Sequence, residues 1–137
     1  MPAAESAPVG VVVAAHGEMA PGLVSAVRLV AGDQPALEPV ALPEAASPEE
    51  FGTLLAAAVD RVDGGAGALV LADLPGATPF NVAARLRHER KGIEVVGGVS
   101  LPMLLEVLLS RDGIALAELA ELAVRSGTAG VRRWEDP

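Results

Sequence analysis

Short runs of consecutive apolar residues alternate along the chain with longer segments in which apolar residues recur every three or four positions. The unbroken runs are typical of β-strands buried on both faces, and they cover Val9–Ala15, Gly67–Ala72 and Ile93–Gly97. A further run, Leu37–Leu42, contains Pro39, which cannot donate a ladder hydrogen bond and therefore indicates a strand at the edge of a sheet.

The segments between and after these runs have the helical period. Ser47-Pro48-Glu49-Glu50 is the clearest helix start, with serine as N-cap, proline in the first turn and glutamate three positions on. Thr78-Pro79 repeats the cap-then-proline pattern, and Leu101-Pro102 opens a further helix. The predicted helices run from Pro21 to Val30, from Ser47 to the glycines at 64–65, from Thr78 to about Arg90, onward from Leu101, and over roughly Ala115–Arg125. Gly127–Trp134 is expected to form a final short strand.

This alternation of strands and helices predicts a three-layer α/β/α domain of the flavodoxin-like class, with helices on both faces of a mostly parallel sheet. Right-handed crossovers leave few topologies, and doubly wound orders such as 2-1-3-4 are among them. Residues 1–8 carry two prolines, one acid and no apolar block, so we interpret them as a flexible tail rather than a signal peptide. Residues 9–137 then form a single domain.

Composition narrows the classes of protein that this fold could serve. Apolar residues make up 51% of the 137 and the mean hydropathy is +0.43, which excludes a disordered chain. No apolar run approaches the roughly 20 residues that a membrane span needs. The net charge of −8 argues against a nucleic-acid partner, whose footprint is a basic patch. Because cysteine is absent, disulfides and thiolate metal sites are excluded, and we expect a soluble cytoplasmic protein.

The residues that leave the first and third strands carry the chemistry of interest. In an open parallel sheet, ligands bind beyond the carboxyl ends of the strands, and in the order 2-1-3-4 the first and third strands are neighbours there. His16 ends the first strand and Asp73 follows the third. A carboxylate that accepts the proton of one imidazole nitrogen leaves the other nitrogen free as a nucleophile. Each residue alone also has an ordinary explanation, as a strand end for His16 and a turn for Asp73.

The segment Thr78-Pro79-Phe80-Asn81 begins a helix at the same edge of the predicted sheet. The unpaired amides and positive dipole end of a helix start favour an anion, and the Thr78 hydroxyl adds a hydrogen bond. A histidine nucleophile, an orienting carboxylate and an anion site suit the carriage of a phosphoryl group. No Gly-rich phosphate loop follows the first strand, and the chain contains no G-x-S-x-G elbow. We predict no metal and no cofactor, and we expect the other histidine, His88, to be solvated.

Three motifs together resemble the mannose-family IIA component (EIIA-Man type) of the bacterial phosphoenolpyruvate-dependent sugar phosphotransferase system. They are Ala15-His16-Gly17, the segment from Asp73 through Asn81, and the segment from Gly97 through Met103. The resemblance covers roughly Val9 to Val131. It implies a parallel sheet of order 2-1-3-4 and a C-terminal antiparallel strand, here Gly127–Trp134, exchanged between the two subunits of a homodimer.

The resemblance also implies roles for individual residues. His16 would be the phosphorylated histidine, accepting the group from the histidine phosphocarrier protein and passing it to a IIB component on another polypeptide, while Asp73 bonds the other ring nitrogen. Thr78 stands where the family has a small hydroxyl residue beside the phosphate. The other phosphate-binding or partner-binding positions are Gly17, Phe80, Asn81 and Ser100. Contact with a membrane would be indirect, through a IIC and IID complex.

Two alternatives stay open beside this interpretation. A small tetrapyrrole metal chelatase also ends its first strand in an Ala/Gly-His-Gly turn, and His16 would there bind metal or accept pyrrole protons, with His88 as the other candidate histidine. A regulatory module is the second alternative, in which phosphorylation of His16 changes partner binding, for example beside a dihydroxyacetone kinase, instead of feeding transport.

Overall fold

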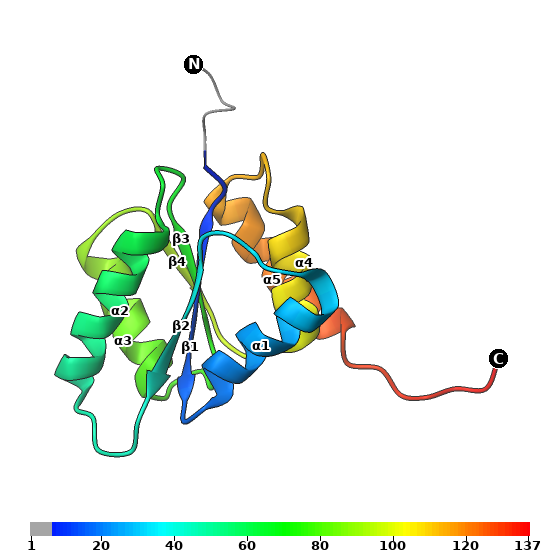
Figure 1. Ribbon diagram of the computed structural model, residues 1–137, viewed down its shortest axis with the longest axis horizontal. Helices are drawn as coiled ribbons and strands as arrows, with labels where there is room; N and C mark the ends of the chain where they lie inside the picture. Colours follow the sequence, from blue (N-terminus) through cyan, green and yellow to red (C-terminus); the bar gives the residue numbers. More distant parts are fainter. Residues whose placement is uncertain (1–6) are drawn as a thin grey trace.

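The computed structural model describes residues 7–137, in which strands and helices alternate as predicted (Figure 1). The strands are β1 (Gly10–His16), β2 (Leu37–Leu42), β3 (Ala68–Ala72) and β4 (Ile93–Val96). The helices are α1 (Met19–Ala31), α2 (Pro48–Val62), α3 (Thr78–Glu89), α4 (Leu101–Ser110) and α5 (Leu116–Ala129). All three strand pairs are parallel and the order is β2-β1-β3-β4, so the flavodoxin-like class is confirmed. Residues 1–6 of the predicted tail lie outside the described residues.

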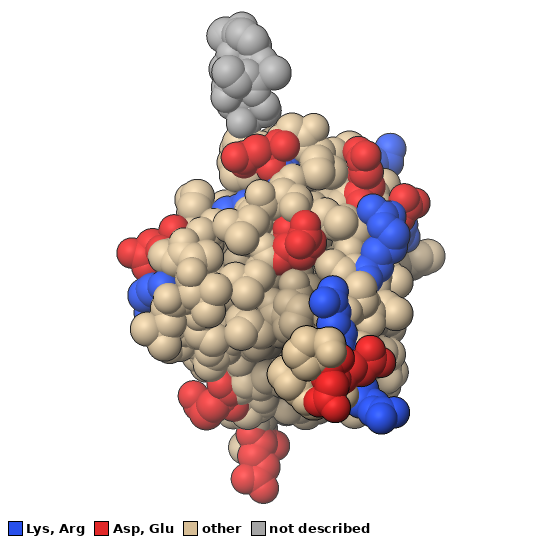
Figure 2. Space-filling view, turned by 90° about the vertical axis from the view of Figure 1, so that its right-hand side faces the viewer, with Lys and Arg blue, Asp and Glu red and all other residues tan. Residues whose placement is uncertain are grey.

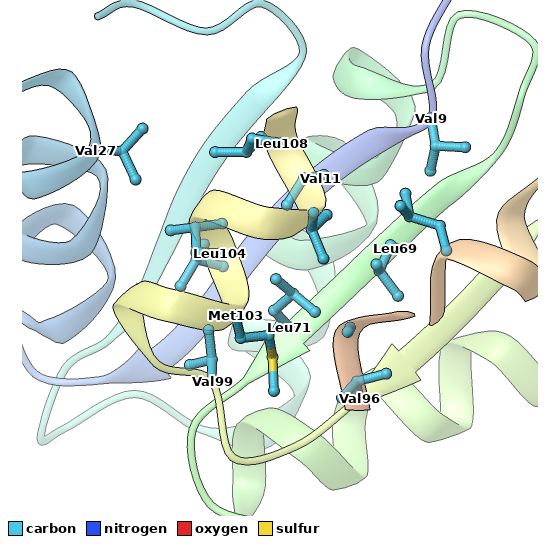
Figure 3. Close-up of a cluster of buried hydrophobic side chains, with 14 of the residues drawn as sticks. Val9, Val11, Val27, Leu69, Leu71, Val96, Val99, Met103, Leu104 and Leu108 are labelled. Carbon is cyan, nitrogen blue, oxygen red and sulfur yellow. The ribbon is translucent and has the colours of Figure 1, made fainter. Parts of the chain in front are cut away.

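Alternate residues of the two central strands point to opposite faces of the sheet and build two separate cores. One face of β1 and β3 packs with α1, α4 and α5 and includes the side chain of Val13. Figure 3 labels Val11, Leu69 and Leu71 on the same face. The other face packs with α2 and α3 through Val12, Ala14, Ala68 and Val70. Because helices cover both faces, β3 and all of β1 except its last residue, His16, are buried, which explains their unbroken apolar runs.

The start of α2 confirms the clearest sequence signal. Ser47 Oγ accepts a hydrogen bond from the Glu50 amide at 3.0 Å, and Glu50 Oε1 accepts one from the Ser47 amide at 2.9 Å. This is a complete capping box, with Pro48 as the first helical residue. The helix therefore begins at the predicted residue.

The prediction of a final strand over Gly127–Trp134 is wrong for the described chain. Helix α5 continues through Ala129, and residues 131–137 have no regular secondary structure and extend from the body (Figure 1). Gly127 lies inside α5 next to α4: a Cβ built on it would be 2.6 Å from Met103 Cε. Helix α5 therefore continues past the glycine at which the predicted strand began.

Other boundaries move by one to three residues. Helix α1 begins at Met19, ahead of the predicted Pro21, and α3 ends at Glu89. None of the helices formed by residues 7–137 is long and apolar enough to cross a membrane.

Candidate functional site

His16 and Asp73 meet at the carboxyl end of the sheet. His16 is the last residue of β1, and Asp73 directly follows β3, which pairs with β1. Asp73 Oδ2 lies 2.7 Å from His16 Nδ1 and also accepts the His16 backbone N–H at 2.9 Å. The predicted juxtaposition of imidazole and carboxylate is therefore present.

The environment of Asp73 keeps its carboxyl group ionised. Partial burial by itself would raise the pKa of Asp73, but hydrogen bonds from the His16 backbone and ring and from the Leu74 amide outweigh it, so the pKa is lowered. The Leu74 amide donates to Oδ1 at 2.8 Å. Because an ionised carboxylate can only accept, we assign the ring proton to His16 Nδ1, which leaves the lone pair on Nε2. The His16 side chain is 49% exposed, so the ring is accessible.

A cavity of about 370 Å³ opens beside His16. The loop between β2 and α2 forms one side of it and the start of α3 contributes Thr78; the lining residues are His16, Gly17, Leu42, Pro43, Glu44, Ala46, Pro48 and Thr78. Gly17 turns the chain away from β1 with φ of +57° while its amide donates to Leu42 O at 3.0 Å. His16, Gly17 and Thr78 thus share one cavity.

Thr78 differs from the prediction in one respect, because it does not cap α3. The N-cap residue is Ala77, which makes no side-chain cap bond, and Thr78 is already the first helical residue. Its hydroxyl is therefore not engaged in capping. The amides of a first helical turn have no acceptor within their own helix, so this end of α3 presents N–H groups and a positive dipole.

Phe80, Asn81 and Ser100 are not among the residues that line this cavity. Asn81 Nδ2 donates to Gly76 O at 2.8 Å. Ser100 caps α4 by accepting a bond from the Met103 amide at 3.3 Å, and the Phe80 ring lies against Gly97. All three support the loops that follow β3 and β4.

Sequence reasoning missed the β2–α2 loop, which brings Glu44 to the His16 cavity. The strand order could have predicted this loop: in a parallel sheet with β2 beside β1, Leu42 pairs with His16, so the residues after Leu42 lie next to His16. A larger cavity of about 450 Å³ lies at the other end of the sheet, between the end of α3 and the start of β4, and the exposed His88 lines it. His88 is therefore solvated, as predicted, and it lies at the opposite end of the sheet from His16.

The segments that follow β1, β2 and β3, residues 16–19, 42–48 and 73–78, form what we call the carboxyl-end face. Glu18 and Glu44 are exposed on it, and these segments contain no Lys or Arg. Figure 2 shows acidic side chains at the lower edge of the molecule, toward which the strands point in Figure 1. Leu74 and Met19 are 59% and 40% exposed. The face is thus acidic and partly apolar.

Among residues 7–137, no three side chains of His, Asp or Glu come close enough together to hold a metal ion. The carboxyl-end face presents the His16–Asp73 pair, the start of α3 and a cavity.

Comparison with known proteins connects this geometry to one family. Residues 10–124 match the family model EIIA-man, described as the PTS system fructose IIA component. The PTS system mannose-specific EIIAB component of Escherichia coli (strain K12) is 34% identical over 128 residues, which is 90% of this chain and 39% of that protein. The chain thus spans about two fifths of that relative. The PTS system sorbose-specific EIIA component of Lacticaseibacillus casei is 29% identical over 80% of this chain and 78% of its own length.

Solved structures agree with the sequence matches. The phosphotransferase system component EIIA from Streptococcus agalactiae has a TM-score of 0.84 at 30% identity, covering 91% of this chain and 96% of its own. The mannose/sorbose-specific IIA subunit from Enterococcus faecalis has a TM-score of 0.85 at 26% identity, with coverages of 96% and 98%.

Proposed function

The chain belongs to the EIIA-man family, the mannose-type IIA components of the sugar phosphotransferase system, and from that premise we propose that it carries the phosphoryl group on His16. The observation that supports this choice is the 2.7 Å contact between Asp73 Oδ2 and His16 Nδ1 beside an exposed ring. An exposed ring whose Nδ1 contacts a carboxylate supports a role for Nε2 as the nucleophile.

The chemistry requires little beyond positioning. His16 Nε2 attacks the phosphorus of a donor phosphohistidine, so that the Nε2–P bond forms as the donor N–P bond breaks and the donor imidazole leaves with its electron pair. The His16 ring gains positive charge in this step, and the adjacent ionised Asp73 stabilises that charge. The open first turn of α3 and the Thr78 hydroxyl line the cavity into which the phosphoryl oxygens project. The reverse attack by an acceptor histidine discharges the carrier.

We propose the histidine phosphocarrier protein as donor and a IIB component as acceptor, both docking on the carboxyl-end face. Glu18 and Glu44 lie on segments that contain no Lys or Arg, so they favour a partner surface with basic residues around its own histidine. We expect the rate of association with such a partner to fall as the salt concentration rises. The exposed Leu74 supplies an apolar contact. Its segment, Leu74–Ala77, lies beside the His16–Asp73 pair, so we propose that it contacts the IIB partner.

We further propose a cytoplasmic homodimer that reaches the membrane only through IIC and IID components. The C-terminal residues 131–137 are exposed and include Val131 and Trp134, which are 84% and 81% exposed. Apolar side chains on an extended terminal segment are suited to contact with a second subunit.

The chelatase alternative is not favoured, because the matched family and relatives are phosphotransferase components and His88 lies outside the His16 cavity. The regulatory alternative uses the same chemistry at His16. Passage of the phosphoryl group onward to a IIB component separates transport from regulation.

The test is phosphorylation of the purified chain with phosphoenolpyruvate, the first enzyme of the system and the phosphocarrier. The wild-type chain should acquire one acid-labile phosphoryl group, detected by ³¹P NMR and intact mass. His16→Gln should acquire none, whereas His88→Gln, which alters the only other histidine, should label at the wild-type rate. An unlabelled wild-type chain, with a phosphocarrier shown to be active on another IIA component, would contradict the proposal. So would a labelled His16→Gln chain.

A further inference from the structure

Asn81 is tied to the segment that carries Asp73. Its side-chain Nδ2 donates to Gly76 O at 2.8 Å, and its backbone N–H donates to Ala77 O at 2.9 Å as the first bond of α3. Two hydrogen bonds from Asn81 therefore connect the first turn of α3 to the five residues that separate β3 from α3.

Residues 74–77 form a β-turn suited to their sequence. The Ala77 amide donates to Leu74 O at 3.1 Å, Pro75 occupies the second position, and Gly76 occupies the third with φ of +88°. Proline followed by a glycine of positive φ is the signature of a type II turn. The side-chain Nδ2 of Asn81 donates to the carbonyl of Gly76, and glycine is the residue of this turn with the greatest backbone freedom.

The loop after β4 also contacts this turn. A Cβ built on Gly97 would lie 2.7 Å from Pro75 Cγ and 3.1 Å from the Phe80 ring, so only glycine permits this close approach. The Gly98 amide donates to Asp73 O at 2.9 Å. Both α3 and the 97–98 segment therefore contact the loop after β3.

Leu74 connects this turn to the chemistry. Its carbonyl closes the turn, and its amide holds Asp73 Oδ1 at 2.8 Å, while Asp73 Oδ2 holds the His16 ring. A change in the conformation of Gly76 would therefore be transmitted through Leu74 to the carboxylate and from there to the imidazole. Displacements of about 1 Å are enough to slow group transfer severely.

On this chain of contacts, and resting on the proposed role of His16, we propose that Asn81 is a positioning residue for phosphoryl transfer. By holding the Gly76 carbonyl it fixes the 74–77 turn, the Asp73 carboxylate and, through them, the Nδ1–H tautomer of His16. Asn81 is not among the residues that line the His16 cavity, and its contribution is to orient the nucleophile without touching the phosphoryl group.

The test compares Asn81→Asp and Asn81→Leu with the wild type. Both variants are close in size to asparagine; the ionised Asp cannot donate to Gly76 O and repels it, and Leu removes the donor without adding charge. Phosphoramidate is the phosphoryl donor, because it needs no docking surface: the Nε2–P bond forms, its own P–N bond breaks and ammonia leaves. We expect both variants to be phosphorylated at His16 about 10-fold or more slowly. In ¹⁵N NMR at pH 8, the single Nδ1–H tautomer should become a mixture.

Arg85→Gln is the matched control, since Arg85 is exposed on the same helix and has no side-chain hydrogen bond within residues 7–137. It should keep the wild-type rate and tautomer. Asn81 is itself exposed, so its variants should retain the far-UV circular dichroism of the fold. Variants within twofold of the wild-type rate, or slow variants with an unchanged tautomer, would overturn the role of Asn81 and leave His16 as the carrier. A wild-type chain that accepts phosphate from neither phosphoramidate nor the phosphocarrier would overturn both.

Discussion

At the level of single residues, one carboxylate oxygen of Asp73 accepts two hydrogen bonds from His16. Oδ2 accepts the backbone N–H of His16, which fixes the end of β1, and it also accepts the ring N–H. The same atom therefore sets both the backbone and the side chain of the proposed nucleophile. A loss of negative charge there should affect the reaction more than the fold.

Asp73→Asn tests that separation. The amide oxygen can still accept a hydrogen bond from His16, but it is neutral and stabilises the charged imidazole poorly. We expect the rate of phosphoryl transfer from the phosphocarrier to fall on the order of 10²-fold. Stopped-flow or quenched-flow labelling measures this rate, with His88→Gln again as the unaffected reference. A variant that transfers at the wild-type rate would show that the charge of Asp73 plays no part.

The free energy of unfolding of the wild type, compared with that of Asp73→Asn, should depend on pH in a defined way. Hydrogen bonding holds the pKa of folded Asp73 below the value of about 3.9 expected in an unfolded chain. A depressed carboxyl pKa stabilises the fold fully above the unfolded value, and that contribution is lost as the pH falls through the folded value. The difference in unfolding free energy between wild type and Asp73→Asn should therefore be constant above about pH 5 and shrink below about pH 4. Urea titrations across this range measure it, and a gap that widens in acid would refute the assignment.

At the level of elements, two helix starts with the same dipeptide pattern behave differently. Ser47-Pro48 has glutamate at the third helical position, and Glu50 bonds back to the Ser47 amide. Thr78-Pro79 has Asn81 in the corresponding place, and its side chain reaches Gly76 instead. Thr78 therefore forms no capping box: Ala77 is the N-cap residue of α3, one residue before the cap that the pattern predicted.

Ser47→Ala should remove the complete cap. We expect the unfolding free energy to fall by about 1 kcal/mol, as is usual for loss of a serine N-cap, with Ser47→Thr close to the wild type. The matched variant Thr78→Ala should leave stability unchanged within about 0.5 kcal/mol, because that hydroxyl caps nothing. Urea unfolding followed by circular dichroism gives all three values. Equal losses at the two positions would mean that both hydroxyls cap their helices.

These elements show what sequence reasoning can reach. Buried strands and the Ser47 start depend on local composition, so their places were predicted, and the parallel order then brought His16 and Asp73 together. The predictions at Gly127 and Thr78 were wrong. Gly127 lies inside α5 next to Met103 of α4, a neighbour distant in sequence that local pattern does not record. Thr78 has the residue pattern of a cap, but Ala77 is the N-cap residue of α3 and Thr78 is already helical.

At the level of the whole molecule, Arg111 joins parts of the chain that no local pattern connects. It is the C-cap residue of α4 and is 3% exposed. Its guanidinium donates to Val9 O at 3.0 Å, 102 residues away in sequence, to Ala36 O at 3.1 Å, and to Pro35 O. Burial lowers the pKa of this guanidinium and the neighbouring Asp112 opposes the shift, so the group stays charged. A lone arginine would be taken for a solvated residue, and the sequence gives no sign of its carbonyl partners.

Val9 and Ala36 directly precede β1 and β2, so Arg111 fastens the amino ends of both strands while the proposed chemistry lies at their carboxyl ends. Arg111→Met keeps most of the side-chain volume but removes the donor to three buried or half-buried carbonyls. We expect the unfolding free energy to fall by about 3 kcal/mol, since unsatisfied buried acceptors are costly. Arg111→Lys, which retains one cationic donor group, should lose less. Phosphorylation of the fraction that remains folded should proceed at the wild-type rate, because the carboxyl-end face is untouched. Urea titrations and initial labelling rates, measured on the same preparations, test this prediction. An Arg111→Met variant of wild-type stability would contradict it. So would a fully folded variant with slowed phosphoryl transfer, because Arg111 would then have more than a structural role.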